Sequence, residues 1–561
     1  MPRTSYQACG FSCQAAGLLL SFLLLLSPTV FAFQCTPEAF QQIVPSTATV
    51  EFARQLQDNA TFEVPEGNVA YPISPTQLRA LCVVQVNVTS SPSSMYSFGL
   101  FLPENWNGRF LAVGNGGFSG GINWLDAAAG VGYGFASMST DTGHSSVSSD
   151  LSWALNEPEK QIDFGYRAMH GSVVLAKEIV AAYHGTNSSY SYYSGCSTGG
   201  RQGLKDIELY PEDFNGVLAG APAWWTAHLQ TWTVRLALYN LPTTAEHHIP
   251  PALFPTIASE VLRQCDPQDG LIDTIISDPR ACHFVPETLL CSPRSTNTSE
   301  CLTPAQLTTL DHIYHDYVDT NQTFVFPHLE IGSEGQWEVL LGSTQPSGLG
   351  TGYVQNLLLN DPDWSFYDFN YSIVAFADKL DPGNATADNF DLSPFHKAGG
   401  KLLHYHGLAD GLIATGSSDY FYSQVIRTLR PQGIELDSWY RYFPVPGMQH
   451  CGGTAADVNS PWYFAGANQA ADLNPSVNGV PGFRDADHDA LLALMRWTEN
   501  ATAPDQIIAT KWHNDTLQDK VLRQRPLCPY PQRAEYAGNG DPDAAENWQC
   551  RDKYSLNVQQ P

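Results

Sequence analysis

Basic residues are scarce in this chain of 561 residues. It contains 28 lysines and arginines against 56 aspartates and glutamates, which gives a formal net charge of −28. A field of this sign repels nucleic acid and anionic membrane surfaces, so neither is an expected partner. The sequence also lacks internal repeats and long low-complexity tracts.

Long hydrophobic runs are missing after the N-terminus, where no segment approaches 18 apolar residues, so we expect no membrane span. Residues 1–32 are predicted to be a signal peptide. Arg3 gives a weakly positive start, residues 18–26 form a short apolar run, and Val30-Phe31-Ala32 precedes a cleavage site near Phe33. The sequence therefore predicts a secreted, extracellular protein.

The cysteines and glycosylation sequons agree with export. Of the 12 cysteines, Cys9 and Cys13 lie in the predicted signal peptide, which leaves ten. An even number in an oxidising compartment favours disulfides over free thiols. Nine N-x-S/T sequons also fit a glycosylated surface; they are at Asn59, Asn87, Asn187, Asn297, Asn321, Asn370, Asn384, Asn500 and Asn514.

Strand and helix patterns alternate along residues 107–222, which predicts a mainly parallel sheet. From about 223 to 395 the alternation fades while cysteines and sequons become more frequent, as expected of an inserted domain. The predicted fold class is α/β, with a catalytic domain in two parts, 33–222 and 396–561. The strand candidates are 109–113, 133–140, 190–193, 217–219, 401–405 and 438–443; the helix candidates are 164–183, 199–210 and 490–497. The tail from about Pro526 is expected to be irregular.

Gly195-Cys196-Ser197-Thr198-Gly199 fits the nucleophile elbow, G-x-S-x-G. A sharp turn from strand to helix lifts the serine hydroxyl above the sheet, and small neighbours allow the backbone to turn. The amides at the start of the next helix favour developing negative charge. A glycine-rich structural turn is the alternative explanation for this pattern.

A serine nucleophile needs a base, which an acid holds in place. In α/β-hydrolases these partners follow in the order Ser, Asp or Glu, His. Asp410 and His450 each come directly after a predicted strand, where such sheets place their sites. A turn or helix cap is the usual role of a lone aspartate there. The rival histidines are His404, His406 and His488; we expect the first two to serve in packing or support.

Two cysteines flank these candidates, because Cys196 precedes Ser197 and Cys451 follows His450. If the two cysteines are bonded, their α-carbons lie about 5.5 Å apart. The serine and histidine are then each only about 3.8 Å further along the backbone. Such a bond would bring nucleophile and base together, although local pairing of each cysteine stays open.

The oxyanion of an ester intermediate needs two hydrogen-bond donors. The amide of Thr198, the residue after the nucleophile, is one. The glycine-rich turn after the strand at 109–113 should supply the other. Gly117 is the preferred donor, with Gly116 and Phe118 as alternatives.

Taken together, these motifs resemble the fungal tannase and feruloyl esterase family, and feruloyl esterase B in particular. The family signature joins a Cys-Ser pair, an Asp and a His-Cys pair, here Cys196-Ser197, Asp410 and His450-Cys451. The segment 192–203 matches the family elbow almost letter for letter. The resemblance spans nearly the whole mature chain and implies an α/β-hydrolase core, a large inserted lid domain and a Cys196–Cys451 disulfide.

The resemblance also implies the remaining disulfides and a structural calcium ion in the lid, with no organic cofactor. The loop 266–273 is rich in oxygen donors, which calcium prefers, but it does not fit an EF-hand and could be an Asp-rich turn. Carried over from the family, the ligands are the side chains of Asp266, Asp269 and Asp273 and the carbonyls of Leu271 and Ile275. The implied disulfides are Cys35–Cys82, Cys265–Cys282, Cys291–Cys301 and Cys528–Cys550.

The expected activity is hydrolysis of an ester by Ser197, His450 and Asp410 through an acyl-enzyme. The resemblance implies a small aromatic ester or a feruloylated polysaccharide as substrate, with ferulate on arabinoxylan or pectin as first choice. Tannin gallate esters are the closest rival, and an inactive carbohydrate-binding protein is the rival of another class. A homodimer is a candidate assembly.

Lid tryptophans could stack on the aromatic acid or belong to the lid core: Trp224, Trp225, Trp337 and Trp364.

Overall fold

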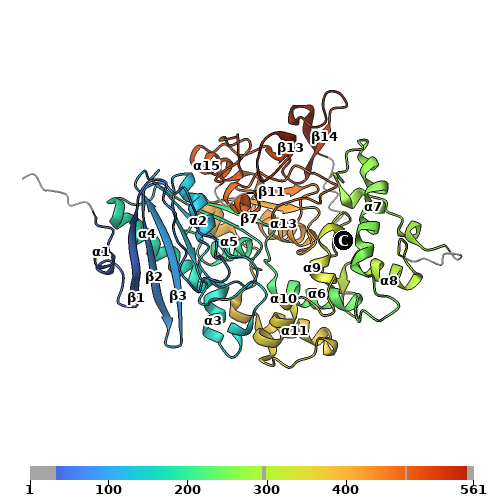
Figure 1. Ribbon diagram of the computed structural model, residues 1–561, viewed down its shortest axis with the longest axis horizontal. Coiled ribbons are helices and arrows are strands. Elements are labelled where there is room, and N and C mark those ends of the chain that lie inside the picture. The colour runs from blue at the N-terminus through green and yellow to red at the C-terminus, as the bar shows by residue number, and fades with distance from the viewer. Residues whose placement is uncertain (1–32, 293–298, 474–476, 553–561) are drawn as a thin grey trace, which may run out of the picture.

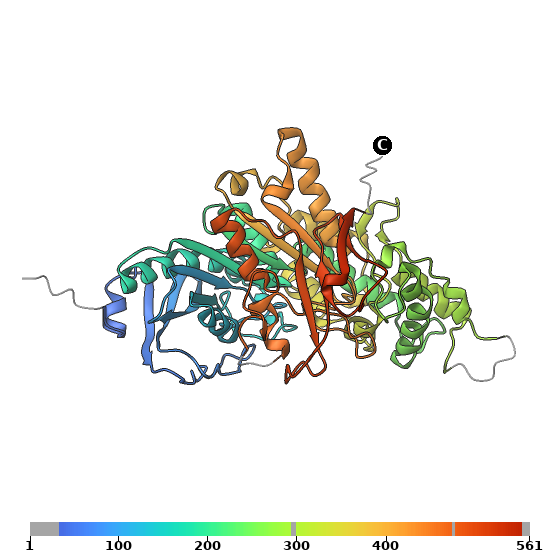
Figure 2. The ribbon, with the colours of Figure 1, turned by 90° about the horizontal axis from the view of Figure 1, so that it is seen from above.

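Residues 33–292, 299–473 and 477–552 are described by the computed structural model of the chain, shown in Figures 1 and 2. The predicted signal peptide and the sequon at Asn297 lie outside the described residues. Within the described residues, no helix has both the length and the apolar character needed to cross a bilayer.

A nine-stranded sheet in the order β1-β2-β3-β5-β4-β6-β7-β10-β11 forms the centre of the molecule. From β5 to β11 all neighbouring strands are parallel, as the alternating pattern predicted, whereas β1 to β3 form an antiparallel extension that pattern did not anticipate. The strands are β1 Ala48–Leu56, β2 Leu81–Ser91, β3 Ser94–Pro103, β4 Arg109–Val113, β5 Ala136–Thr140, β6 Tyr190–Cys196, β7 Gly216–Gly220, β10 Lys401–Gly407 and β11 Tyr440–Val445.

Helices cover both faces of this sheet, each over its own buried apolar core. One face packs against α4 (Ala168–His184), α5 (Thr198–Leu209) and α13 (Gly416–Leu429). The other packs against α2 (Trp124–Gly132) and α15 (Ala490–Asn500). This three-layer arrangement confirms the α/β prediction, because each parallel strand is buried on both sides and needs helices above and below it.

The chain between β7 and β10 consists mainly of short helices, and many of them pack around an apolar core of their own at the opposite end of the molecule from β1 (Figure 1). The segments around α10 and α11 instead share an apolar cluster with Phe118, Leu151 and Phe164 of the central domain. We call residues 221–400 the insertion. Its longest helix, α6, packs towards the central domain, while α7 and α8 lie at the far edge. Its elements are α6 Thr226–Tyr239, α7 Phe254–Cys265, α8 Pro304–Ile313, β8 Tyr317–Val318, β9 Phe324–Phe326, α9 Glu338–Leu341, α10 Gly348–Gly352, α11 Tyr371–Leu380 and α12 Ser393–Lys397.

The C-terminal tail is regular, so the expectation of an irregular tail is wrong. β12 (Ile507–Trp512) pairs with β13 (Val521–Leu527), and β14 (Gln532–Tyr536) pairs with β15 (Trp548–Asp552). Most side chains of β13, β14 and β15 are only partly buried or exposed, so the hydrophobic period of these strands is weak in the sequence. The Trp548 side chain, packed under the Arg525 guanidinium, anchors the last strand.

All five disulfides that the resemblance implies are present. Cys196–Cys451 joins segments 255 residues apart, whereas Cys265–Cys282 and Cys291–Cys301 in the insertion close loops of 17 and 10 residues. Cys35–Cys82 anchors the start of the described chain to β2, and Cys528–Cys550 holds the last hairpin.

Candidate active site

Ser197 lies in the one-residue turn between β6 and α5. Its backbone adopts φ 62° and ψ −125°, a conformation that costs a residue with a Cβ about 1–3 kcal/mol. Two backbone hydrogen bonds oppose this strain: the Ser197 amide donates to the Gly220 carbonyl (2.9 Å), and the Ser197 carbonyl accepts from the Ala223 amide (3.0 Å). A side chain at Gly195 would approach the Gly199 backbone to 2.7 Å, so the elbow requires glycine there.

Asp410 and His450 meet across the ends of β10 and β11. The distance between His450 Nδ1 and Asp410 Oδ2 is 2.7 Å, and the Asp410 carboxylate is fully buried. Its second oxygen accepts hydrogen bonds from the Leu412 and Ile413 amides at 2.8 and 2.9 Å. Both oxygens are therefore satisfied, which fixes the carboxylate in the orientation that holds the imidazole.

The charges of this pair reinforce each other. Burial favours a neutral Asp410, but the charge of His450 and the hydrogen bonds from His406 and His450 hold the pKa of Asp410 below its usual value. Burial likewise opposes protonation of His450, yet the Asp410 charge and hydrogen bond hold the pKa of His450 above its usual value. A base of raised pKa beside a permanent anion is suited to accept a proton from a serine hydroxyl.

His406 supports the acid rather than replacing the base. Its Nε2 lies 3.0 Å from Asp410 Oδ2, and its Nδ1 lies 2.7 Å from the Ser418 hydroxyl. His404 contacts the same hydroxyl at 2.8 Å and the Tyr440 hydroxyl at 2.8 Å. Both histidines are fully buried, in agreement with the packing and support roles expected for them.

Ser197 and His450 line the same cavity, of about 440 Å³. Cys196 and Cys451 line it too, and the bond between them sets their α-carbons 5.9 Å apart. The disulfide thus joins the serine elbow directly to the histidine loop. Apolar groups from other segments, among them Ile73, Leu349 and Leu412, complete the wall.

The amides near this cavity distinguish the three candidates for the second oxyanion donor. The Gly116 amide donates to the Tyr71 hydroxyl (2.8 Å) and the Phe118 amide to the Ser148 carbonyl (2.9 Å). Within the described part of the chain, no acceptor is assigned to the Gly117 amide. Gly117 also has φ +54°, and a Cβ there would come within 2.7 Å of Ser148 Cβ, so the turn itself requires glycine.

Gln336, from the insertion, links the two loops that carry the acid and the base. Its Oε1 accepts hydrogen bonds from the Gly411 amide and the His450 amide, both at 3.0 Å. Sequence reasoning missed this residue, since a glutamine in a loop-rich segment carries no motif. Only the fold brings a residue of the insertion between two strand ends of the central domain.

Two further carboxyl groups in the cavity were also missed, those of Asp126 and Asp472. Burial raises the pKa of Asp126 to about 7, with a smaller contribution from the negative charge of Asp472 and an opposing hydrogen bond from Asn123. Asp126 lies in the first turn of α2, where acidic residues are common, so the sequence alone gives no sign that it lines the cavity. The cavity that Ser197 lines therefore has an acidic side, on which the pKa of Asp126 lies near neutral pH.

The lid tryptophans belong to packed cores rather than to this cavity. Trp337 is fully buried and contacts the rings of Phe254 and Tyr314, and Trp224 is buried against Trp225. Trp364 packs against the apolar cluster that the insertion shares with Phe118 and Phe164 of the central domain. Among the described residues that line the cavity with Ser197, none of the four is present. Trp337 lies in the core of the insertion, whereas Trp224 lies in the core on one face of the central sheet.

The loop expected to bind calcium brings negative charges together. Burial raises the pKa of Asp266, and the charges of Asp273 and Asp269 add to the rise. Asp273 also forms an ion pair with Arg525. The Asp266 carboxylate accepts from the Asp273 and Thr274 amides, and the Asp269 carboxylate accepts from the Leu271 amide. The donor chemistry fits calcium, although one side chain of the set already has a cationic partner.

The nucleophile elbow between a parallel strand and a helix, with acid and base after later strands, defines an α/β-hydrolase. A family model described as "Tannase and feruloyl esterase" matches residues 79–334 and 361–551. The chain belongs to this family, and it is an esterase.

Relatives agree over most of the chain. A probable feruloyl esterase B-2 from Neosartorya fischeri is 33% identical over 95% of this chain and 98% of its own. A probable feruloyl esterase B-1 from Aspergillus oryzae is 36% identical over 85% of this chain and 84% of its own. The crystal structure of feruloyl esterase B from Aspergillus oryzae superposes with a TM-score of 0.83 at 33% identity, covering 92% of this chain and 100% of that one. A tannin acyl hydrolase from Aspergillus niger shares the fold at 21% identity, with a TM-score of 0.72 over 92% of this chain and 95% of its own.

Proposed function

We propose that the protein releases ferulate or a related hydroxycinnamate from plant cell-wall polysaccharides such as arabinoxylan or pectin. The observation that carries the proposal is the hydrogen-bonded Asp410–His450 pair in the same cavity as the strained Ser197, with a disulfide between the two loops. Relatives named feruloyl esterase B, which cover most of the chain, support the choice of acid.

The mechanism starts with proton transfer from the Ser197 hydroxyl to His450 Nε2 as the serine oxygen attacks the ester carbonyl. The negative charge that develops on the carbonyl oxygen is stabilised by the Thr198 and Gly117 amides. Asp410 holds the imidazole by Nδ1 and stabilises its positive charge while the proton is held. The intermediate collapses as His450 returns the proton to the leaving alcohol, which is the sugar hydroxyl.

Deacylation repeats the same steps with water. His450 removes a proton from a water molecule, the resulting hydroxide attacks the acyl carbonyl, and the Ser197 oxygen leaves with the proton that His450 returns. The products are the free acid and the original enzyme. The raised pKa of His450 implies that kcat/KM falls on the acid side, because protonation removes the base before the reaction begins.

Turnover of methyl ferulate and methyl gallate by the same preparation tests the choice of substrate. We expect a higher kcat/KM for methyl ferulate. A strong preference for gallate would overturn the proposal and identify the second candidate, a tannase. The carboxyl groups of Asp126 and Asp472 give that candidate physical support, since they can accept hydrogen bonds from ring hydroxyls.

We propose that the protein acts outside the cell. The five disulfides support this proposal, because such bonds persist in oxidising compartments. Expression of the full chain in a fungal host should deliver a glycosylated enzyme to the medium that starts near Phe33. An enzyme retained inside the cells with its first 32 residues intact would contradict this. Light scattering of the secreted enzyme decides between a monomer and the proposed homodimer.

We also propose that calcium stabilises the loop through Asp266, Asp269 and Asp273 and the carbonyls of Leu271 and Ile275. Calcium adds positive charge to a set of carboxylates that repel one another, so its removal should lower Tm. Differential scanning calorimetry with and without a calcium-selective chelator measures this change. In Asp269→Asn the effect of the chelator should be reduced, and in the exposed variant Asp58→Asn it should be unchanged. An equal response of Asp269→Asn and wild type would exclude the site.

A further inference from the structure

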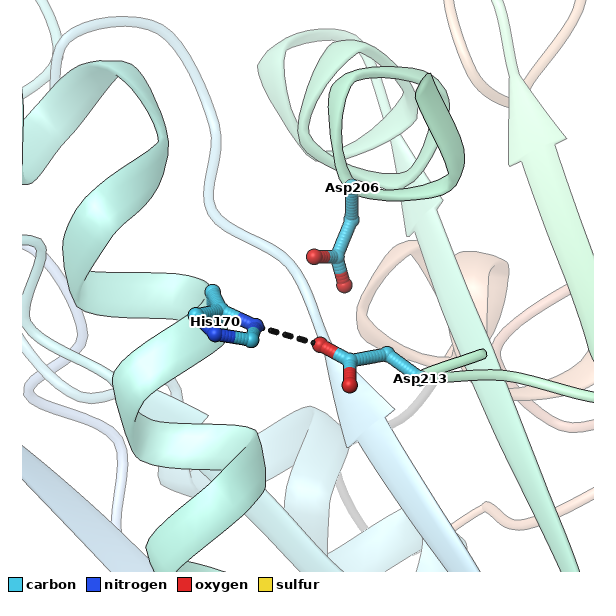
Figure 3. A group of neighbouring side chains, drawn as sticks. All are labelled: His170, Asp206 and Asp213. Atoms are coloured by element: carbon cyan, nitrogen blue, oxygen red, sulfur yellow. Dashed lines mark hydrogen bonds and ion pairs between the residues drawn. The ribbon is translucent and has the colours of Figure 1, made fainter. Parts of the chain in front are cut away.

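A second cluster of metal-ligating side chains lies away from the catalytic cavity. His170 of α4, Asp206 of α5 and Asp213 of the following loop each place one ligand atom within 4.8 Å of the others (Figure 3). Asp206 comes nine residues after Ser197 on α5, which is about 13 Å along the helix axis. The cluster therefore belongs to the far end of the helix that starts at the nucleophile.

Asp206 is the unusual member of this cluster. Its side chain is 3% exposed, and its Oδ2 is buried without a hydrogen-bond partner among the described residues. Burial, and then the negative charge of Asp213, raise the pKa of Asp206 well above its usual value, while Lys177 opposes the rise. Buried carboxylate oxygens are normally satisfied, because removing them from water without a partner is costly. This oxygen therefore requires a proton or a cation.

Lys177 does not supply that cation directly. The Lys177 ammonium donates to the backbone carbonyl of Asp213, and it lies 5.5 Å from the Phe214 ring centroid and 5.8 Å from that of Phe110. It is thus held beside the cluster by other contacts. Its charge reaches Asp206, but it forms no hydrogen bond with the unpartnered oxygen.

His170 is oriented for ligation by its neighbours. Its Nδ1 lies 2.7 Å from Asp213 Oδ2, and its ring stacks on Tyr210 with centroids 3.4 Å apart and planes 7° apart. In Figure 3 the side chains of all three residues point toward one another from three separate backbone segments. Two ligand atoms that each lie about 2.0–2.2 Å from a metal ion are further apart from each other than two hydrogen-bonded atoms are. A small widening of the His170–Asp213 contact would therefore make room for an ion.

One imidazole nitrogen and two carboxylate oxygens form a donor set of defined preference. Calcium and magnesium favour all-oxygen sites, whereas zinc and related first-row ions accept imidazole together with carboxylate. Three protein ligands leave one position of a tetrahedral ion for water. The set is mixed and only partly exposed, so it favours a transition metal over an alkaline-earth ion.

We propose that His170, Asp206 and Asp213 bind a divalent transition metal, with zinc as the ion of best fit, and that the ion cross-links α4, α5 and the loop after α5. In the bound state His170 carries its ring proton on Nε2, so that Nδ1 is free to bind the metal. The ion takes no part in ester hydrolysis, because the cluster lies outside the catalytic cavity.

Direct binding of zinc to the full-length enzyme tests the proposal. Enzyme stripped with a chelator and returned to excess calcium is titrated with zinc in a calorimeter, with an expected stoichiometry of one. Zinc at about one hundred times its Kd should raise Tm by roughly 2 °C. Cobalt substituted for zinc should give the visible absorption of a tetrahedral site with nitrogen and oxygen ligands.

Three variants make the test specific. Asp206→Asn keeps the side-chain shape and should abolish both zinc binding and the zinc-dependent rise in Tm. His170→Gln should have the same two effects. Its position is partly exposed and tolerates exchange, so this variant serves as the test if Asp206→Asn fails to fold. His488→Gln is the matched control, because His488 Nδ1 pairs with Asp485 at 2.8 Å and, among the described residues, His488 belongs to no group of three possible ligands.

Unchanged zinc affinity in His170→Gln or Asp206→Asn would overturn the proposal, as would the absence of any binding to wild-type enzyme. Asp206 would then be a neutral buried acid that retains its proton. Equal losses of zinc binding in His488→Gln would also overturn it, since they would assign the ion to surface histidines in general.

Discussion

The central domain and the insertion hold their functional residues in different ways. In the central domain Ser197, Asp410 and His450 follow strands of one sheet, and a single disulfide across 255 residues joins two of the loops. The insertion consists of short helices whose disulfides close loops of only 17 and 10 residues. It reaches the loops after β10 and β11 through Gln336 and the wall of the cavity through Leu349. The sheet therefore positions the reacting atoms, while the insertion braces their loops.

The largest expected effect is the loss of the proposed nucleophile in the central domain. Ser197→Ala should reduce kcat on methyl ferulate by roughly 10⁴-fold or more while the protein stays folded, since catalysis by the pair of Asp410 and His450 requires the serine oxygen. Steady-state kinetics and circular dichroism measure the two properties. Ser145→Ala, at an exposed serine, should behave as wild type, and substantial activity in Ser197→Ala would assign the nucleophile elsewhere.

Removal of the long-range disulfide should affect both activity and stability. In the chain-entropy view, closing the 255-residue loop of Cys196–Cys451 stabilises the fold by about 5.5 kcal/mol at most, and closing the 10-residue loop of Cys291–Cys301 by about 2.7 kcal/mol. The double variant Cys196→Ala/Cys451→Ala should lose roughly 10- to 100-fold in kcat, because a shift of about 1 Å between nucleophile and base is costly.

The disulfide of the insertion provides the matched comparison. Cys291→Ala/Cys301→Ala should lower Tm and leave kcat near that of wild type. Thermal denaturation and kinetics on both double variants distinguish the two regions. An equal loss of kcat in the two would show that the insertion positions the catalytic loops as strongly as the sheet does.

Loss of the contact between Gln336 and both loops should have a smaller effect on kcat. Gln336→Leu removes the acceptor shared by the Gly411 and His450 amides, and we expect roughly a 10-fold lower kcat with little change in KM. The acid limb of the pH profile should also shift, because the His450–Asp410 distance sets the pKa of the base. Gln336→Glu retains an acceptor and should recover much of the activity, whereas Gln345→Ala, elsewhere in the insertion, should change neither quantity.

The smallest expected effect is the contribution of the Asp126 carboxyl to the pH dependence of stability. Its pKa of about 7 in the folded protein lies above its ordinary value of 3.8, so the folded state retains a proton that the unfolded state has lost. The stabilisation of the protonated form is complete below about pH 4 and is lost as the pH rises through 7. Between pH 5 and pH 8 the Tm of Asp126→Asn should therefore fall less than that of wild type. A parallel fall in the two proteins would contradict the raised pKa.

The α/β core was predictable because its signals are local. Strand and helix periods, the stop at Pro211 after α5 and the glycines around Ser197 all act within a few residues of each other. The antiparallel strands β1 to β3 and the two hairpins of the tail were not anticipated. The tail strands β13 to β15 are mostly partly exposed, which weakens their period. β2 and β3 are largely buried, but two consecutive strands without a helix between them fall outside the strand–helix alternation on which the prediction rested.

The proposed roles of Ser197, Asp410 and His450, their order along the chain and the family were already contained in the sequence, since each rests on a short motif. Only the tertiary structure brought Gln336 to the catalytic loops, Asp126 and Asp472 to the cavity, and His170, Asp206 and Asp213 to one another. These contacts join segments that share no local pattern. Packing determines them, because the apolar cores of the sheet and of the insertion fix the relative positions of the segments and so of their polar side chains.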